Sequence, residues 1–259
     1  MLPGILLLTI VGWRDDRLPV SSLTRLLVQL AVSIWLLGFG RSELAVGDLA
    51  YLAIAALAMV WMMNLYNFMD GSNGMAGFQG LFAGVLIAIF FQAGEQYAMA
   101  LIALITAAAC VGFLPLNFPQ ARVFMGDVAS VPLGFIFASM AIYGLHTGVI
   151  SPALSVLIMS VFIVDATLTL LARVFAGERW YTAHNQHVYQ RLIAEGWSHS
   201  CVLVIYQVIN VILVLPAIVL AAMYTQYVIV TVGLTLLILG AGWYTVNWKL
   251  GMRATRRLE

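Results

Sequence analysis

Two adjacent carboxylates, Asp15 and Asp16, are the first residues whose type and spacing could do chemistry. Neighbouring carboxylates repel each other, so one of them titrates at a raised pH or both share a cation. A pair of this kind could bind Mg²⁺ or act as a general base. Arg14 and Arg17 flank the pair and neutralise it, so a solvated loop without a chemical role is the alternative interpretation.

A second polar group lies at the end of an apolar stretch, where Asn64, Asn67 and Asp70 follow at intervals of three residues. On a helix this spacing places the three side chains on one face. Gly71 and Gly74 then allow the backbone to turn and to approach a ligand closely. Polar residues at the end of an apolar helix are costly without polar partners, which favours a binding role. The alternative is a polar cap with an ordinary Asp-Gly turn.

A third polar segment contains Arg122 and Asp127, between two further apolar stretches. Pro119 is expected to end the preceding helix, and Gly126 with Asp127 to begin the next one. An aspartate near a helix N-terminus, beside an arginine, would suit a magnesium ion and an anionic ligand. The alternative for Asp127 is an N-cap without a chemical role.

The fourth polar segment holds His184 and His187, two of the four histidines in the sequence, and Arg191 follows them. Histidines at this spacing could contribute to a zinc site, but no thiolate or third nitrogen ligand accompanies them. Contacts from His187 and Arg191 to an anionic substrate fit the segment better. A basic surface loop is the alternative. Asp165, in an apolar stretch eight residues before Arg173, could pair with a base or reach the site, and the sequence leaves both open.

A membrane protein is the kind of scaffold that the composition predicts for these segments. Of the 259 residues, 63% are hydrophobic and 9% are charged, and the mean hydropathy is +1.00. A soluble domain has about 25% charged residues, so this protein is expected to face lipid. A net charge of +1 without a basic patch argues against nucleic acid as a partner. We therefore predict a single all-α membrane domain over residues 1–259.

The apolar stretches predict a polytopic transmembrane helix bundle. About 20 apolar residues are needed to cross the hydrocarbon core of a bilayer. Residues 2–13 are too few, and we expect a clipped helix there, so that the protein would lack its natural start. About eight full spans are predicted, at residues 22–39, 49–67, 75–92, 97–117, 131–146, 151–172, 199–222 and 226–247.

The basic residues predict the sidedness of these spans. With the loop at residues 14–17 in the cytoplasm, eleven of the twelve Lys and Arg residues fall on the cytoplasmic side, and only Arg41 falls outside. The same alternation brings all four polar segments to the cytoplasmic face. Four segments that can hold phosphate or metal on one face are a feature that a purely structural membrane protein would not need.

Together the four segments resemble the polyprenyl-phosphate N-acetylhexosamine-1-phosphate transferases, a bacterial family of the glycosyltransferase family 4 type that includes phospho-N-acetylmuramoyl-pentapeptide transferase. The matching pieces occur in family order: Asp15-Asp16-Arg17, Asn64-Leu-Tyr-Asn67-Phe-Met-Asp70-Gly71, Phe124-Met-Gly-Asp127, and the histidine loop from Ala183 to Leu192. That loop is most similar to the O-antigen-initiating branch. The sequence departs from the family at Asn73, where a second Asp is usual, and at Ala129, where Gly is frequent. The family also has further helices before the Asp-Asp loop.

The resemblance implies an enzyme that transfers a sugar 1-phosphate from a UDP-N-acetylhexosamine to undecaprenyl phosphate and releases UMP. It implies a Mg²⁺ cofactor, with Mn²⁺ as the alternative, and the bacterial inner membrane as the location. The reaction would be the first membrane step of O-antigen or another cell-envelope polysaccharide. The implied catalytic residues are Asp15, Asp16, Asp70, Asp127 and His187, and Asp127 and Asp70 would bind the metal. The implied substrate-binding residues are Asn64, Asn67, Arg122, His184 and Arg191.

Two other function classes fit part of the sequence. A secondary transporter would place its polar residues near the middle of the bilayer, in broken helices or inverted repeats, whereas most polar residues here lie at one face. A non-catalytic assembly protein, descended from the enzyme but lacking its first helices, is the other class. An intramembrane aspartyl protease is disfavoured, because Phe124 replaces the first Gly of a Gly-x-Gly-Asp pattern. The identity of the sugar and the formation of a homodimer stay open.

Overall fold

The computed structural model describes residues 1–38, 46–178 and 185–256. Within these ranges the protein forms helices and no strands, which confirms the predicted all-α class. The α-helices are α1 (Leu2–Asp15), α2 (Ser22–Gly38), α3 (Val46–Phe68), α4 (Met75–Ala93), α5 (Tyr97–Asn117), α6 (Gly126–Thr147), α7 (Pro152–Ile158), α8 (Ser160–Phe175), α9 (Val188–Ala194), α10 (His199–Ile209), α11 (Leu215–Met223) and α12 (Val228–Arg256). A π-helical turn η1 (Asn210–Val214) joins α10 to α11, and a 3₁₀ turn η2 (Thr225–Tyr227) precedes α12.

Six helices in the described ranges are long and apolar enough to cross a membrane, and each coincides with a predicted span. They are α3, α4, α5, α6, the continuous segment from α10 to α11, and α12. The predicted stretch 151–172 is a pair of helices, α7 and α8, bent by 82°, which makes a seventh span if the pair crosses together. The predicted stretch 22–39 contains α2, an apolar helix of 17 residues that is shorter than a full span. Both helices are apolar, and hydropathy does not indicate where a helix bends, so the sequence predicted α7 and α8 as one span.

The bend between α7 and α8 is stabilised by a polar side chain from α4. A break in a membrane helix frees backbone groups that lipid cannot satisfy, so neighbouring side chains must bond them. Gln79 is completely buried, and its Nε2 donates to the Ile158 carbonyl at 3.0 Å. Asn210, the first residue of η1, donates in turn to Gln79 Oε1 at 2.8 Å. One series of hydrogen bonds therefore joins α4, the bend and the π-helical turn.

Replacing Gln79 by Met is expected to lower the free energy of unfolding by roughly 1–2 kcal/mol. The Ile158 carbonyl and the Asn210 amide would each lose a buried partner, while the side-chain volume would be nearly conserved. Unfolding of the purified protein in mixed micelles measures this difference. Gln92→Met, at the exposed end of the same helix, is the matched control, and equal stability of the two variants would contradict the assignment.

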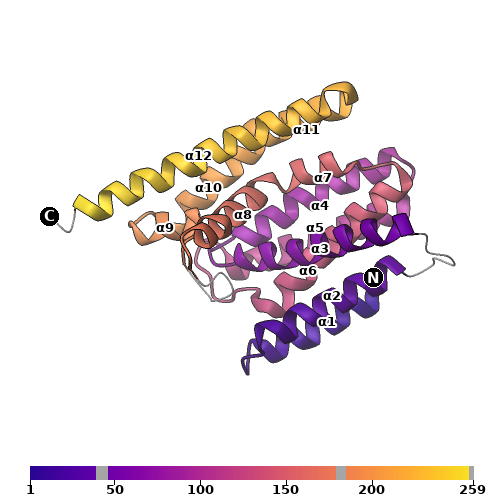
Figure 1. Ribbon diagram of the computed structural model, residues 1–259, viewed down its shortest axis with the longest axis horizontal. Helices are drawn as coiled ribbons and strands as arrows, with labels where there is room; N and C mark the ends of the chain where they lie inside the picture. Colours follow the sequence, from indigo (N-terminus) through magenta and orange to yellow (C-terminus); the bar gives the residue numbers. More distant parts are fainter. Residues whose placement is uncertain (39–45, 179–184, 257–259) are drawn as a thin grey trace.

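The α1–α2 hairpin packs on one side of the bundle, where it contacts α6 and α3 (Figure 1). Its buried side chains, such as Leu8 and Val32, form a hydrophobic cluster with Met63 of α3 and Phe135 of α6. This cluster is separate from the larger core, most of whose members come from helices α3 to α12. Because α1 lies along α6, the C-terminal end of α1 is brought beside the N-terminal end of α6. This packing places the Asp-Asp pair next to Asp127.

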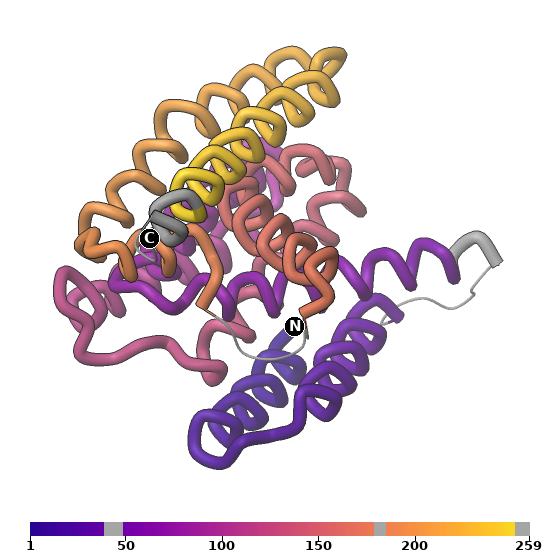
Figure 2. The backbone as a smooth tube through the Cα atoms, turned by 60° about the vertical axis from the view of Figure 1, so that its left-hand side comes forward, coloured from indigo at the N-terminus to yellow at the C-terminus, as the bar shows by residue number. Residues whose placement is uncertain are grey.

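The polar segments gather at one end of the bundle. Figure 1 shows α9 and the C-terminal ends of α8 and α12 toward the left, and the α1–α2 turn at the left end of its hairpin, at the bottom of the view. Figure 2 shows α9 close to α12, which it contacts. Arg14, Arg173 and Arg191 lie in the last turns of α1, α8 and α9. The helices therefore bring basic residues to the same end as the acidic segments.

Candidate active site

Three aspartates from separate segments meet at the first turn of α6. Asp16 accepts the backbone N–H of Asp127 at 3.0 Å and that of Val128 at 3.1 Å, one on each carboxylate oxygen. Asp70 Oδ2 accepts the N–H of Gly126 at 3.0 Å. The first N–H groups of a helix lack partners within the helix, and the helix dipole favours negative charge there. The N-terminus of α6 therefore holds the Asp-Asp loop and the Asp70 loop together.

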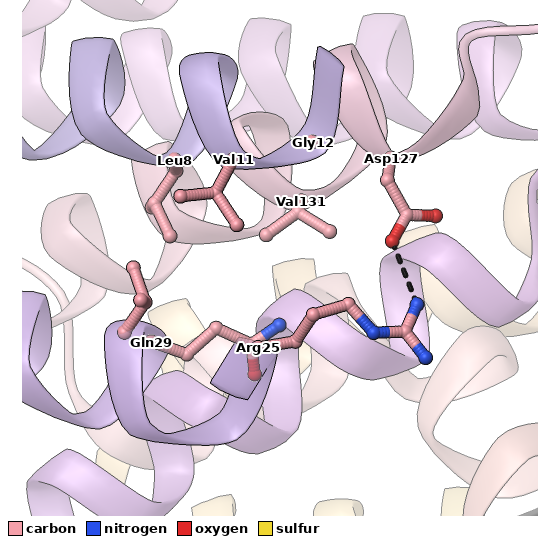
Figure 3. A pocket seen from close by; sticks show the side chains of 8 residues that line it. Leu8, Val11, Gly12, Arg25, Gln29, Asp127 and Val131 are labelled. Atoms are coloured by element: carbon pink, nitrogen blue, oxygen red, sulfur yellow. Dashed lines mark hydrogen bonds and ion pairs between the residues drawn. The ribbon is translucent and has the colours of Figure 1, made fainter. Parts of the chain in front are cut away.

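Arg25, near the start of α2, connects the fourth aspartate to this group. Its Nη1 donates to Asp15 Oδ2 at 2.8 Å and to Asp127 Oδ2 at 2.9 Å, and Figure 3 shows the second contact. The other oxygen of Asp15 accepts the N–H of Val20 at 2.6 Å. The sequence reasoning missed Arg25 as a site residue. Its position ten residues after Asp15 does not reveal toward which neighbour its side chain points.

Asp70 is the most deeply buried of the four site aspartates, with 7% of its surface exposed. Its Oδ1 atom is buried and makes no hydrogen bond within the described residues. Burial raises the pKa of Asp70 to about 7, and the nearby carboxylates of Asp127 and Asp16 add to this rise. The backbone N–H groups of Gly126 and Met125 act in the opposite direction. A buried carboxylate oxygen without a partner is suited to a ligand that the protein itself does not supply.

A narrow pocket lies beside the Arg25–Asp127 pair, between α1, α2 and α6 (Figure 3). Apolar side chains form most of its wall, and polar groups stand at one side. The lining residues are Leu8, Val11, Gly12, Arg25, Val28, Gln29, Asp127 and Val131. The charged pair therefore lies where an apolar wall meets the polar end of the bundle.

The two predicted asparagines connect α3 to its neighbours. Asn64 Nδ2 donates to Gln29 Oε1 of α2 at 2.7 Å, and Asn67 Oδ1 accepts the hydroxyl of Ser130 of α6 at 2.8 Å. Both bonds hold helices that carry site residues. Substrate contact by either asparagine stays a prediction.

A third asparagine, Asn117, holds the Asp70 loop against the segment that leads to α6. Its Oδ1 accepts the N–H of Gly74 at 2.7 Å, and its Nδ2 donates to the Val123 carbonyl at 2.8 Å. Asn73 donates to the Pro119 carbonyl at 2.9 Å. The sequence reasoning gave Asn117 no role, although an asparagine at the end of an apolar helix was an available signal.

The histidine segment docks on the end of α3. His187 is 2% exposed and stacks between Phe68, with ring centroids 5.8 Å apart, and Tyr189, at 6.0 Å. The Tyr189 hydroxyl donates to the Phe68 carbonyl at 2.7 Å. Tyr189, which the sequence reasoning did not select, therefore places this segment beside the Asp70 loop.

Asp165, left open by the sequence, anchors the histidine segment from α8. Its side chain is buried, and Oδ1 accepts the N–H of Val188 at 2.9 Å. Its Oδ2 accepts the Tyr206 hydroxyl at 2.6 Å. His187 Nδ1 lies 3.9 Å from Asp165 Oδ1. Asp165 therefore holds the histidine segment in place, which does not decide between the two interpretations of its role.

The remaining predicted residues lie farther around this end. Arg191 donates to the Asn247 side chain of α12, and Arg122 is exposed in the connection between α5 and α6. His184 lies outside the described residues. The structure thus brings Asp15, Asp16, Asp70 and Asp127 into one site, with the segment around His187 beside Asp70.

The stability of the protein is expected to fall at mildly acid pH because of His187. Burial lowers the pKa of this histidine from its ordinary value of 6.5, and Arg173 adds to the lowering, while Asp165 opposes it. The unfolded protein therefore takes up the proton first, and stability is lost as the pH falls below 6.5. We expect His187→Gln to remove up to about 1 kcal/mol of the stability difference between pH 7.5 and 5.5. Thermal unfolding at the two pH values measures it, and an unchanged difference would contradict the assignment.

Within residues 1–38, 46–178 and 185–256, no three side chains of Asp, Glu, His or Cys stand close enough to hold a metal ion by themselves. Magnesium usually takes one or two carboxylates and completes its shell with waters and substrate phosphates. The unpartnered oxygen of Asp70 and the partly exposed carboxylate of Asp127 are hard oxygen ligands of that kind. The residues therefore fit a magnesium ion that binds together with a phosphate substrate.

Comparison with known proteins relates the sequence to transferases. Residues 1–145, which carry three of the four polar segments, match glycosyl transferase family 4. The protein is 27% identical over 230 residues to a probable undecaprenyl-phosphate N-acetylglucosaminyl 1-phosphate transferase of Bacillus subtilis, covering 84% of its own length and 64% of that relative. It is 30% identical over 236 residues to decaprenyl-phosphate N-acetylglucosaminephosphotransferase of Mycobacterium tuberculosis, covering 78% and 58%.

A phospho-N-acetylmuramoyl-pentapeptide-transferase of Staphylococcus saprophyticus is 28% identical over 169 residues, which cover 64% of this protein and 50% of that relative. The sequence thus spans less than two thirds of the length of these relatives. The match to glycosyl transferase family 4 includes the α6 N-terminus, where the aspartates meet.

Proposed function

This protein belongs to glycosyl transferase family 4, and we propose that it transfers a sugar 1-phosphate from a UDP-N-acetylhexosamine to undecaprenyl phosphate. An oxygen of the lipid phosphate forms a bond to the phosphorus that carries the sugar. The bond between that phosphorus and UMP breaks, so the products are undecaprenyl-diphosphate-sugar and UMP. The relatives named for N-acetylglucosamine support this sugar class.

The observation that carries the proposal is the meeting of four aspartates at the first turn of α6, at the end of an apolar bundle. One substrate is a water-soluble pyrophosphate and the other a lipid phosphate, so their reacting groups can meet only at a membrane interface. Asp15, Asp16, Asp70 and Asp127 lie at such an end, with basic residues around them. This arrangement supports phosphoryl chemistry at the membrane surface.

A magnesium ion, held by Asp127 and Asp70, is the cofactor that we propose, and Mn²⁺ would use the same oxygen ligands. When bound, it would lower the repulsion between the two anionic substrates and stabilise charge on the departing UMP. Asp16 holds the first turn of α6 through two backbone N–H groups and so fixes the direction of Asp127. Asp15 would position the lipid phosphate. A phosphate monoester is already largely ionised near neutral pH, so this step needs no strong base.

The positive residues around the acidic group are the proposed contacts to substrate phosphates. Arg122 is exposed beside the α6 N-terminus and can reach a soluble nucleotide. Arg191 belongs to a segment that docks next to Asp70, and the buried His187 would position this segment through its stacking on Phe68. The excess of basic residues at this end supports the cytoplasmic face of a bacterial inner membrane as its location. A place in O-antigen or other envelope polysaccharide synthesis is part of the same proposal.

The test is transfer of label into lipid. Membranes that contain the protein are incubated with labelled UDP-N-acetylglucosamine, undecaprenyl phosphate and Mg²⁺, and label in the organic phase is measured. We expect transfer to fall to background when EDTA removes the cation and to return when Mg²⁺ is added back. Label that persists in EDTA would overturn the cofactor proposal. If neither this sugar nor its 6-deoxy relatives give label in the organic phase, the transferase proposal is overturned.

A transporter is the second candidate, because the 82° break between α7 and α8 is a feature that transporter helices share. The buried Gln79 and Asn210 lie at this break. Uptake of labelled UDP-sugar into sealed vesicles, without lipid-linked product, would favour that function. Lipid-linked product that forms equally in opened membranes would favour the transferase.

A further inference from the structure

One guanidinium nitrogen serves two carboxylates that come from different helices. Arg25 Nη1 lies 2.8 Å from Asp15 Oδ2 and 2.9 Å from Asp127 Oδ2. Both contacts are charge-assisted hydrogen bonds. The two carboxylate oxygens are therefore held within two hydrogen-bond lengths of each other, with a positive charge between them.

Backbone groups, not side chains, hold the other two carboxylates. Asp16 accepts two N–H groups of the first turn of α6, and Asp70 accepts the N–H of Gly126. In the part of the protein that the structure describes, no ion pair reaches Asp16 or Asp70. Among the described residues, Arg25 is therefore the cationic side chain that makes ion pairs with the aspartates of this site.

Arg25 is also the more exposed partner in its two ion pairs. Its side chain is 34% exposed, while those of Asp15 and Asp127 are 13% and 16% exposed. The N–H of Val20 fixes Asp15, and the first turn of α6 fixes Asp127. Figure 3 shows the arginine extended along one side of the small pocket, with the guanidinium at its tip. A long side chain anchored only at its tip can leave without moving a helix.

We infer that Arg25 is a placeholder for the divalent cation, and that the two exchange at Asp127. A cation bound by Asp127 and Asp70 shares the Asp127 carboxylate with the guanidinium, and two positive charges beside one carboxylate repel each other strongly in a partly buried site. Carboxylate oxygens are the ligands that Mg²⁺ prefers, so the ion displaces the guanidinium. Before the ion binds, Arg25 keeps Asp15 and Asp127 from repelling each other. The inference rests on the proposed function only in that a cation binds at Asp127.

The experiment measures cation binding without any substrate. The purified 259-residue protein in detergent is titrated with Mn²⁺, and the free ion is measured by electron paramagnetic resonance, with Mg²⁺ as competitor. We expect Arg25→Gln to bind Mn²⁺ roughly tenfold more tightly than the wild type, because the competing charge is gone. Arg25→Lys should give an intermediate affinity, since a single ammonium group keeps the charge but reaches less far.

Arg17→Gln is the matched control, because it removes an equal charge from the turn that carries Asp16. Its guanidinium lies over the Trp13 ring, 4.3 Å from the centroid. We expect its affinity for Mn²⁺ to stay within about twofold of the wild type. An equal gain in Arg17→Gln would mean a general field effect and would overturn the exchange.

Weaker or unchanged binding in Arg25→Gln would also overturn the exchange, as would a wild type and variant that both fail to bind Mn²⁺. If Arg25→Gln does not fold, Arg25→Lys provides the test: Mn²⁺ binding tighter than in the wild type supports the exchange, and equal or weaker binding refutes it. If the protein transfers sugar phosphate but Arg25→Gln binds Mn²⁺ with the wild-type affinity, only the exchange is refuted. Tighter binding in a protein that transfers nothing would refute only the transferase.

Discussion

Asp127→Asn is expected to reduce sugar-phosphate transfer by at least about a thousandfold. The change keeps the size of the side chain, and an amide oxygen can still accept the Arg25 Nη1 that now lies 2.9 Å away. The backbone N–H of residue 127 still reaches Asp16. The variant therefore loses the negative charge that would hold the cation and little else. Transfer of label from UDP-N-acetylglucosamine to the lipid phase measures the loss.

The matched control is Glu95→Gln, which removes a carboxylate from the exposed turn between α4 and α5. We expect this control to transfer at the wild-type rate. Thermal unfolding of all three proteins shows whether a loss of transfer comes with a loss of the fold. A non-catalytic homologue would tolerate Asp127→Asn, so partial activity within about threefold of the wild type would refute the assignment.

The membrane-spanning helices could be predicted without the structure, because they follow from the distribution of apolar residues along the sequence. Lipid accepts only segments that satisfy their own backbone groups, so apolar runs of sufficient length became helices α3 to α6, the α10–α11 segment and α12. The position of a polar residue relative to the end of an apolar stretch also indicated how close it lies to the membrane surface. Asp16, Asp70 and Asp127 could therefore be assigned to one face before any packing was known.

Helix packing could not be predicted in the same way. In a span such as α6, apolar residues surround the whole helix, so no face is marked as the one that contacts α1. The partners of Asn64 and Asn67 were hidden for this reason, because their register with Asp70 did not reveal Gln29 or Ser130. The shared hydrogen bond of Arg25 is hidden too, since it depends on the relative position of three helices.

The close packing of α1 on α6 makes both transfer and stability sensitive to a substitution at Gly12. Gly12 faces the backbone of α6, and a Cβ atom at this residue would collide with the Asp127 carbonyl oxygen. The nearest contacts are backbone atoms, including the Val128 nitrogen at 2.7 Å. A side-chain rotation therefore cannot relieve the clash, and the helices must separate.

We expect Gly12→Ala to reduce transfer by about a hundredfold, because a displacement of about 1 Å at a reacting group has an effect of this size. The same separation would lengthen both hydrogen bonds from the α6 N-terminus to Asp16. Stability should fall by roughly 1–3 kcal/mol, as for other overpacked interiors. The label-transfer assay and unfolding in mixed micelles measure the two effects.

Gly112→Ala in α5 separates this close approach from the general effect of a new methyl group. A Cβ at Gly112 meets nothing within 4 Å, and alanine favours a helix more than glycine does. This control should retain full transfer and wild-type or slightly higher stability. If Gly12→Ala behaved in the same way, α1 could not lie against α6 as described. The Asp-Asp pair would then have no fixed place beside Asp127, and the four-aspartate site would lose its structural basis.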